Sequence, residues 1–297
     1  MHLLREMLHS LRAAPGFALA LLITLAAAAF NGLAVFQPAL IGGVIDMSDM
    51  HFVGAQHRTH DLAFGFLFLP GVVGIFAQFR RPSKNVAGQL MAVIPSAALL
   101  LTLVLTVVLT NNTTVLQPPW VTVMTSALIA TTLHPAGRDF FCSFSDGRTS
   151  WVMLALVIIA AVPLLVFAST NLGLQGTVTD DHASLGHYGF MVAFSFTVIG
   201  TGLLASLRPD GWRLTAWVAG LLPALLGATS VMYPDATSSL SPVWGFAATA
   251  WGVGFVAAAE LAKDAGGRAM FSWRPHGAGA GRAAPVTRAR PRRGRGL

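Results

Sequence analysis

Residues 151–169 read WVMLALVIIAAVPLLVFAS, an apolar stretch that contains no charged side chain. A transmembrane helix needs about 20 predominantly apolar residues to cross roughly 30 Å of hydrocarbon. Helices of soluble proteins rarely stay apolar on every face over such a length. This stretch therefore predicts a helix that spans a membrane.

Similar apolar blocks recur along the whole chain. Hydrophobic residues make up 54% of the 297 residues and charged residues only 10%, whereas an average soluble domain is about 25% charged. We therefore expect an all-α fold, a polytopic transmembrane helix bundle in contact with the lipid bilayer. The apolar blocks predict about eight spans, at Phe17–Phe36, Leu62–Phe79, Val86–Leu109, Trp120–Leu133, Trp151–Ser169, Tyr188–Leu207, Leu214–Met232 and Val243–Leu261.

The basic residues predict the orientation of these spans. If the N-terminus is inside and the spans alternate, 18 of the 19 Lys and Arg residues fall on inner segments, and only Arg58 lies outside. Positive charge resists translocation, so cytoplasmic loops carry the Lys/Arg excess. We expect a plasma-membrane protein with both termini in the cytoplasm. The first span is expected to be a retained anchor, because a signal peptide has an apolar region of only about 7–15 residues.

Several sequence features recur at an offset of 124–128 residues and predict an internal duplication. Both halves have an even number of spans, so the repeat is expected to be parallel, with four spans in each half. The predicted organisation is a first half at 1–136, a second half at 137–264 and a basic tail at 265–297. The paired features are His60 to Pro82 with His187 to Pro209, Pro95 with Pro223, and Pro118-Pro-Trp120 with Pro242-Val-Trp244.

The tail at 265–297 contains eight Arg residues and no acidic residue. It is rich in Gly, Pro and Ala and is expected to be disordered, because it cannot bury a core. One interpretation is a basic tail that only fixes the topology. The other is attraction to anionic lipid, worth about 1 kcal/mol for each basic residue near the surface. The topology accounts for the positive charge, and nothing indicates nucleic-acid binding.

The outer segments carry an unusual set of histidines and aspartates. Imidazole and carboxylate groups bind divalent transition metals without a thiolate. The repeat places His60 and His187 at the same depth on two helices, where they could hold a metal ion or a haem. The alternatives are ordinary interfacial residues, helix caps, or a proton sensor. The candidate ligands are His57, His60, Asp61, Asp181, His182 and His187.

Three classes of function stay open. The sequence contains no nucleotide-binding GxxxxGK[ST] loop, HExxH helix or GxSxG elbow, so we expect no enzyme and name no catalytic residue. The first class is a transporter of small molecules or ions with a path between the halves, lined by Asn31 or by Ser195, Thr197 and Thr201. A packed interface between the halves would count against it. The second class is a redox or metal protein with the outer site, and the third is an accessory subunit of a membrane complex.

Two runs of sequence carry a resemblance to a known family. The first extends from His60 through Phe79-Arg-Arg-Pro-Ser-Lys-Asn-Val-Ala. The second is Asp181-His-Ala-Ser-Leu-Gly-His-Tyr with Gly211-Trp-Arg and Trp244-Gly downstream. Together they resemble an uncharacterised family of actinobacterial polytopic membrane proteins. The resemblance covers most of the chain except the tail and implies no particular activity or catalytic residue.

Overall fold

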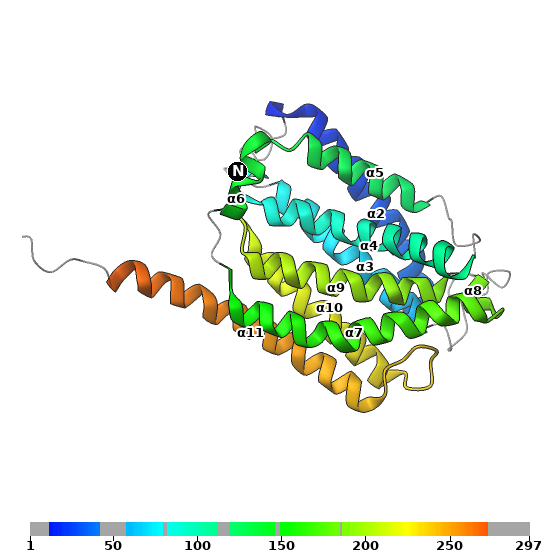
Figure 1. Cartoon of the computed structure of the whole chain (residues 1–297). Coiled ribbons are helices and arrows are strands. Elements are labelled where there is room, and N and C mark those ends of the chain that lie inside the picture. The colour runs from blue at the N-terminus through cyan, green and yellow to red at the C-terminus, as the bar shows by residue number, and fades with distance from the viewer. Residues whose placement is uncertain are drawn as a thin grey trace, which may run out of the picture. The chain divides into compact units, whose positions relative to one another are not determined.

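The computed structural model describes residues 12–41, 58–79, 82–111, 119–145, 149–184 and 186–272 (Figure 1). Throughout these ranges the secondary structure is helical, without a strand, which confirms the all-α prediction. Met1–Ala262 form one compact unit, and Lys263–Leu297 form a second. His57 and residues 273–297 lie outside the described residues, so the predictions that concern them stay predictions.

Each of the eight predicted spans overlaps one helix, and these helices have 14 to 31 residues. The described helices extend beyond the predicted spans mainly at their ends: α11 continues to Ser272, α7 to Thr177 and α2 to Ile41, and α3 begins four residues earlier. Short helical turns fill the connections, namely η3 (Pro82–Lys84), η4 (Gly137–Phe140), α6 (Cys142–Ser145) and α8 (Asp181–Ser184). The long helices are α2 (Pro15–Ile41), α3 (Arg58–Gln78), α4 (Val86–Thr110), α5 (Pro119–Thr132), α7 (Trp151–Thr177), α9 (His187–Leu207), α10 (Trp212–Met232) and α11 (Pro242–Ser272).

Among the described residues, six helices are long and apolar enough to cross a membrane: α3, α4, α7, α9, α10 and the Pro242–Ala262 part of α11. α5 has 14 residues, and a helix of that length rises only about 21 Å at 1.5 Å per residue. α2 has 27 residues, but side chains are described only for its first part, and Pro15–Phe30 alone is shorter than a typical span. The multi-pass helical architecture is therefore present, while the crossing of α2 and α5 stays a prediction.

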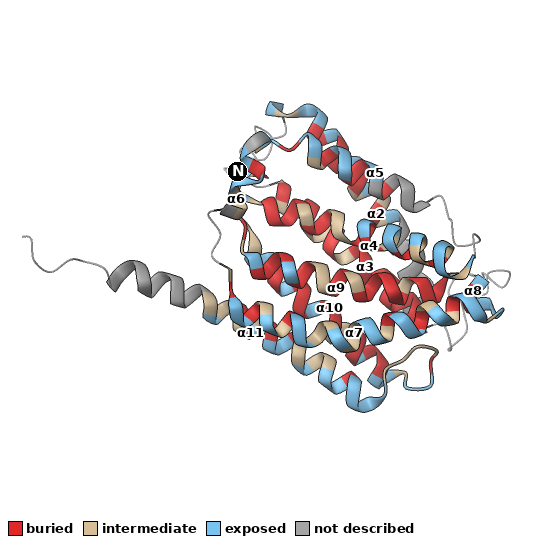
Figure 2. Cartoon of the chain, in the orientation of Figure 1, coloured by how far each residue is buried: buried red, intermediate tan, exposed pale blue. Residues whose placement is uncertain are grey.

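The helices differ in which of their faces are covered. α3, α9 and α10 are buried over most of their length, whereas α7 and α11 expose large apolar side chains (Figure 2). Ile159, Val162 and Val253, for example, are each 65% exposed. A water-soluble protein rarely presents so extended an apolar surface. This distribution fits central helices surrounded by helices that contact lipid.

Equivalent helices of the two halves make similar contacts. In the first half, α2 packs on α3 and α5, and α4 packs on the same two helices. In the second half, α9 packs on α7 and α10, and the Trp251 Nε1–H of α11 donates to the Leu156 carbonyl of α7 at 3.0 Å. Between the halves, α3 and α4 contact α9 and α10. Within each half, helices that are neighbours in the sequence therefore pack together, and the two halves are in contact through α3, α4, α9 and α10.

Glycines bring α10 and α11 together. The recurrence of Gly220 with Gly227, and of Gly245 with Gly252, at seven-residue intervals predicts close helix packing. A Cβ atom added to Gly220 would lie 2.5 Å from the Gly252 carbonyl oxygen. Gly227 faces the Gly245 carbonyl in the same way. The prediction is confirmed, since the two backbones approach where neither has a side chain.

Candidate functional site

The end of the bundle that carries α8 is shaped by a tight turn between α8 and α9 (Figure 1). The Asp180 carboxylate accepts the Ala183 N–H at 2.9 Å, which is the usual way for an aspartate to begin a helix. Gly186 then has φ 75°, a left-handed conformation that favours glycine. The chain therefore reverses at once, and His182 and His187 come to lie on the two sides of the turn.

Three histidines meet at this end of the bundle. The His60 ring of α3 lies 5.1 Å from the His182 ring and 5.3 Å from the His187 ring, measured between centroids. The His182 and His187 centroids are 5.8 Å apart. His60 is 0% exposed, His187 2% and His182 7%. His60 and His187, which the repeat predicts at the same depth on two helices, are therefore in contact. His182 lies beside both and completes a buried group of three.

Tyr188, which is buried, and Asp180, whose side chain is 43% exposed, lie beside this group. The Tyr188 ring lies 5.5 Å from the His60 ring and 5.9 Å from the His182 ring. Its hydroxyl donates to Asp180 Oδ2 at 2.9 Å, and His182 Nδ1 lies 3.5 Å from the same oxygen. Burial tends to raise the pKa of Asp180, but the Ala183 and Tyr188 hydrogen bonds and the nearby His182 outweigh it and lower the pKa.

Buried hydrogen bonds from other helices fix the turn in place. The Gln175 side chain of α7 is fully buried and donates to the Ala183 carbonyl at 2.6 Å. Its Oε1 atom accepts the Gly189 N–H at 3.2 Å. Thr59, next to His60, shares a 2.7 Å hydroxyl–hydroxyl hydrogen bond with Ser239 in the connection between α10 and α11. The histidines are therefore held in place by hydrogen bonds from α3, α7, α9 and the connection between α10 and α11.

The other sequence candidates have different surroundings. Asp61 is buried in the first turn of α3, and Asp181 is exposed at the start of α8. The carboxylate that reaches His182 belongs to Asp180, which the candidate set omits. In the described part of the chain, no three or more His, Cys, Asp or Glu side chains have donor atoms gathered as metal ligands. The three histidine rings are therefore close together, but their donor atoms are not gathered into a metal site in this conformation.

His134 lies apart from this group, close to the chain segment that follows α3. Its Nε2 atom is 3.2 Å from Gln78 Oε1, and its ring contacts Phe17 and Phe140. Burial lowers the pKa of His134 to about 4, although a backbone hydrogen bond near Pro82 acts in the opposite direction. This histidine is a neutral packing residue, in line with its isolation in the sequence.

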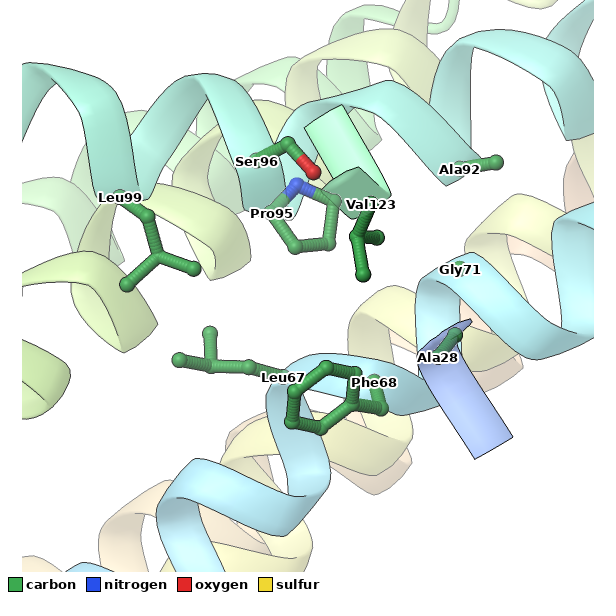
Figure 3. Close-up of a pocket in the computed structure, with 9 residues that line it drawn as sticks. All are labelled: Ala28, Leu67, Phe68, Gly71, Ala92, Pro95, Ser96, Leu99 and Val123. Atoms are coloured by element: carbon green, nitrogen blue, oxygen red, sulfur yellow. The ribbon is translucent and has the colours of Figure 1, made fainter. Parts of the chain in front are cut away.

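The hydroxyl groups predicted to line a transport path are packed inside the described part of the bundle. Ser195, Thr197 and Thr201 are fully buried, and each hydroxyl donates to a carbonyl of its own helix. A cavity of about 20 Å³ lies instead within the first half, beside Pro95 and Phe68 (Figure 3). It has room for little more than one water molecule. The Asn31 side chain lies outside the described residues.

Comparison with known proteins adds no assignment to this geometry. No family model, no curated protein and no solved structure matches the chain.

Proposed function

We propose that this chain is a multi-pass membrane protein that binds a divalent transition-metal ion at its extracytoplasmic end. The ligands are His60, His182 and His187. The observation that carries the proposal is the mutual contact of three buried imidazole rings contributed by α3, α8 and α9.

The spacing of the rings fits a shared ion. Zinc binds imidazole nitrogen at about 2.0–2.1 Å, which puts each ring centroid roughly 3.2 Å from the metal. Three such rings at tetrahedral or trigonal angles have centroids roughly 5.2–5.5 Å apart. The separations here are 5.1, 5.3 and 5.8 Å. The 5.3 Å separation lies within this range and the other two differ from it by about 0.1 and 0.3 Å, which supports a shared ion after small shifts of the rings.

Metal binding would need the His60 and His187 rings to turn toward His182. Rotation about the Cβ–Cγ bond leaves the ring centroid almost in place and sweeps the two nitrogens around it. This terminal torsion itself has broad energy wells. Metal ligands commonly reach their final geometry only when the ion binds.

The donor set favours borderline ions such as Zn²⁺, Cu²⁺ or Ni²⁺. Imidazole suits these ions, whereas Mg²⁺ and Ca²⁺ prefer oxygen ligands. A haem held between His60 and His187 fits less well. Its flat macrocycle would have to lie between two rings whose centroids are only 5.3 Å apart.

The orientation is part of the proposal. Eight spans, with α2 and α5 included, place the histidine group outside and nearly all of the basic residues inside, as the positive-inside rule requires. The similar contacts of the two halves support a parallel repeat of four helices and four. In such a repeat His60 and His187 are equivalent positions that meet near the axis between the halves.

Metal content tests the proposal directly. The protein is purified through a tag without histidine, stripped with a chelator, dialysed against Zn²⁺ and analysed by mass spectrometry for bound zinc. We expect one ion per chain, with loss of binding in His60→Asn and His187→Asn. His276→Ala, outside the group, serves as the control and should keep one ion. Absence of zinc from the native chain, or a full equivalent in the double His60/His187 variant, would refute the proposal.

Transport of the same ion is a second candidate function. The meeting of equivalent helices, α3 with α9 and α4 with α10, is the arrangement of parallel-repeat transporters. The packed interface counts against an open path in this conformation. Uptake of radioactive zinc into proteoliposomes decides the point: flux that His60→Asn abolishes supports transport, and binding without flux excludes it.

A further inference from the structure

We infer that Asp180 is the positioning residue of this site, and that it selects the nitrogen through which His182 binds the metal. The inference rests on the proposed function. It adds a residue that the candidate ligand set omits and assigns it a role distinct from metal ligation.

The Asp180 carboxylate connects three groups around the histidines. Oδ1 accepts the Ala183 N–H at 2.9 Å and so fixes the start of α8. Oδ2 accepts the Tyr188 hydroxyl at 2.9 Å and lies 3.5 Å from His182 Nδ1. One side chain thereby relates the turn, the tyrosine ring and the histidine ring to one another.

The contact at Nδ1 determines the chemistry of the His182 ring. A carboxylate only accepts hydrogen bonds, so it favours the tautomer that carries its proton on Nδ1. In that tautomer Nε2 has a lone pair and is the ligand atom. A carboxylate that holds a ligating histidine in this way also raises its basicity, and the loss of such a partner weakens metal binding by about 10–100-fold.

The surroundings of Asp180 make this orientation persistent. Tyr188, which donates to the carboxylate, also packs its ring against His60. Gln175 holds both sides of the α8–α9 turn through the Ala183 carbonyl and the Gly189 N–H. The Asp180 side chain is 43% exposed while that of His182 is 9% exposed, so the carboxylate stands between water and the buried rings.

Asp180→Asn separates positioning from folding. Asparagine begins helices as well as aspartate does, so its Oδ1 atom can still accept the Ala183 N–H. Its amide then presents N–H to His182 Nδ1. This favours the opposite tautomer, in which Nε2 carries the proton and cannot bind metal. Asp181→Asn, at the next and exposed position, makes the same chemical change without a contact to the rings.

The experiment compares Zn²⁺ affinity and the visible spectrum of bound Co²⁺ in the native chain and both variants. We expect Asp180→Asn to bind about 10–100-fold more weakly and to change the Co²⁺ absorption bands, while Asp181→Asn matches the native chain. Nitrogen NMR of the metal-free protein should show the His182 proton moving from Nδ1 to Nε2 in Asp180→Asn only.

Two results would overturn the inference, and they have different meanings. If the native chain binds metal and Asp180→Asn binds it with the same affinity and spectrum, Asp180 does not position His182 and the proposed function still stands. If the native chain binds no metal, the proposed function fails and the inference fails with it.

Discussion

The glycine contact between α10 and α11 supports a quantitative prediction. A Cβ atom at Gly220 would lie 2.5 Å from the Gly252 carbonyl oxygen and 2.7 Å from the Val256 side chain, whereas ordinary contact begins at 3.4 Å. Gly220→Ala therefore forces the two helices apart by roughly 0.9 Å at this point, an overpacking that costs about 1–3 kcal/mol.

Gly254→Ala is the matched control, because it makes the same change in α11 at a position with nothing within 4 Å of the added Cβ atom. Alanine exceeds glycine as a helix former by about 0.8–1.0 kcal/mol, so this variant should be as stable as the native chain or more stable. In detergent, we expect thermal unfolding of Gly220→Ala to shift down by roughly 2–12 °C. Equal unfolding temperatures for the two variants would refute the close approach of α10 and α11.

Three further predictions concern other parts of the bundle. The pKa of His134 is lowered from 6.5 to about 4, so the unfolded chain takes up a proton before the folded chain does. Stability should fall as pH drops through this window, and His134→Gln should remove that part of the pH dependence measured by thermal unfolding. Cys142 is exposed and should react with a membrane-impermeant maleimide only after cells are permeabilised; labelling of intact cells would reverse the proposed orientation. Arg213→Met breaks a 2.8 Å ion pair with Glu260, yet it should cost only about 0–1 kcal/mol by chemical denaturation because the pair is partly exposed, and a loss of several kcal/mol would contradict this.

The positions of the helices could be predicted because membrane spans are recognised by composition alone. A helix overlaps each of the eight apolar blocks, including the one that begins at Trp151, and six of these helices are long and apolar enough to cross a membrane among the described residues. The helix ends were harder to predict. α3 begins at Arg58, four residues before the apolar block, because its first turn is buried by neighbouring elements. Burial against neighbouring helices does not show in a hydropathy pattern. Hydropathy also does not decide whether α5, with only 14 residues, crosses the membrane.

The site could be predicted in part. The repeat predicts that His60 and His187 lie at the same depth, because they are equivalent positions of a parallel duplication. It gave no reason to choose Asp180 over Asp181, since adjacent residues of a turn differ only in their backbone geometry. The hydrogen bond from the Ala183 N–H to Asp180 and the left-handed Gly186 decide that Asp180 faces the rings. Tyr188 follows His187 directly in the sequence, but its hydrogen bond to Asp180 depends on the geometry of that same turn and could not be predicted.

The central claim is that three imidazoles share one metal ion. X-ray absorption at the zinc edge of the metal-loaded protein measures this most directly, because it reports the type, number and distance of the ligand atoms. We predict about three nitrogen ligands at roughly 2.0–2.1 Å, with the outer-shell scattering of imidazole rings, and a loss of that scattering in the double His60→Asn, His187→Asn variant. A first shell made only of oxygen, or a spectrum that the double variant leaves unchanged, would contradict the account.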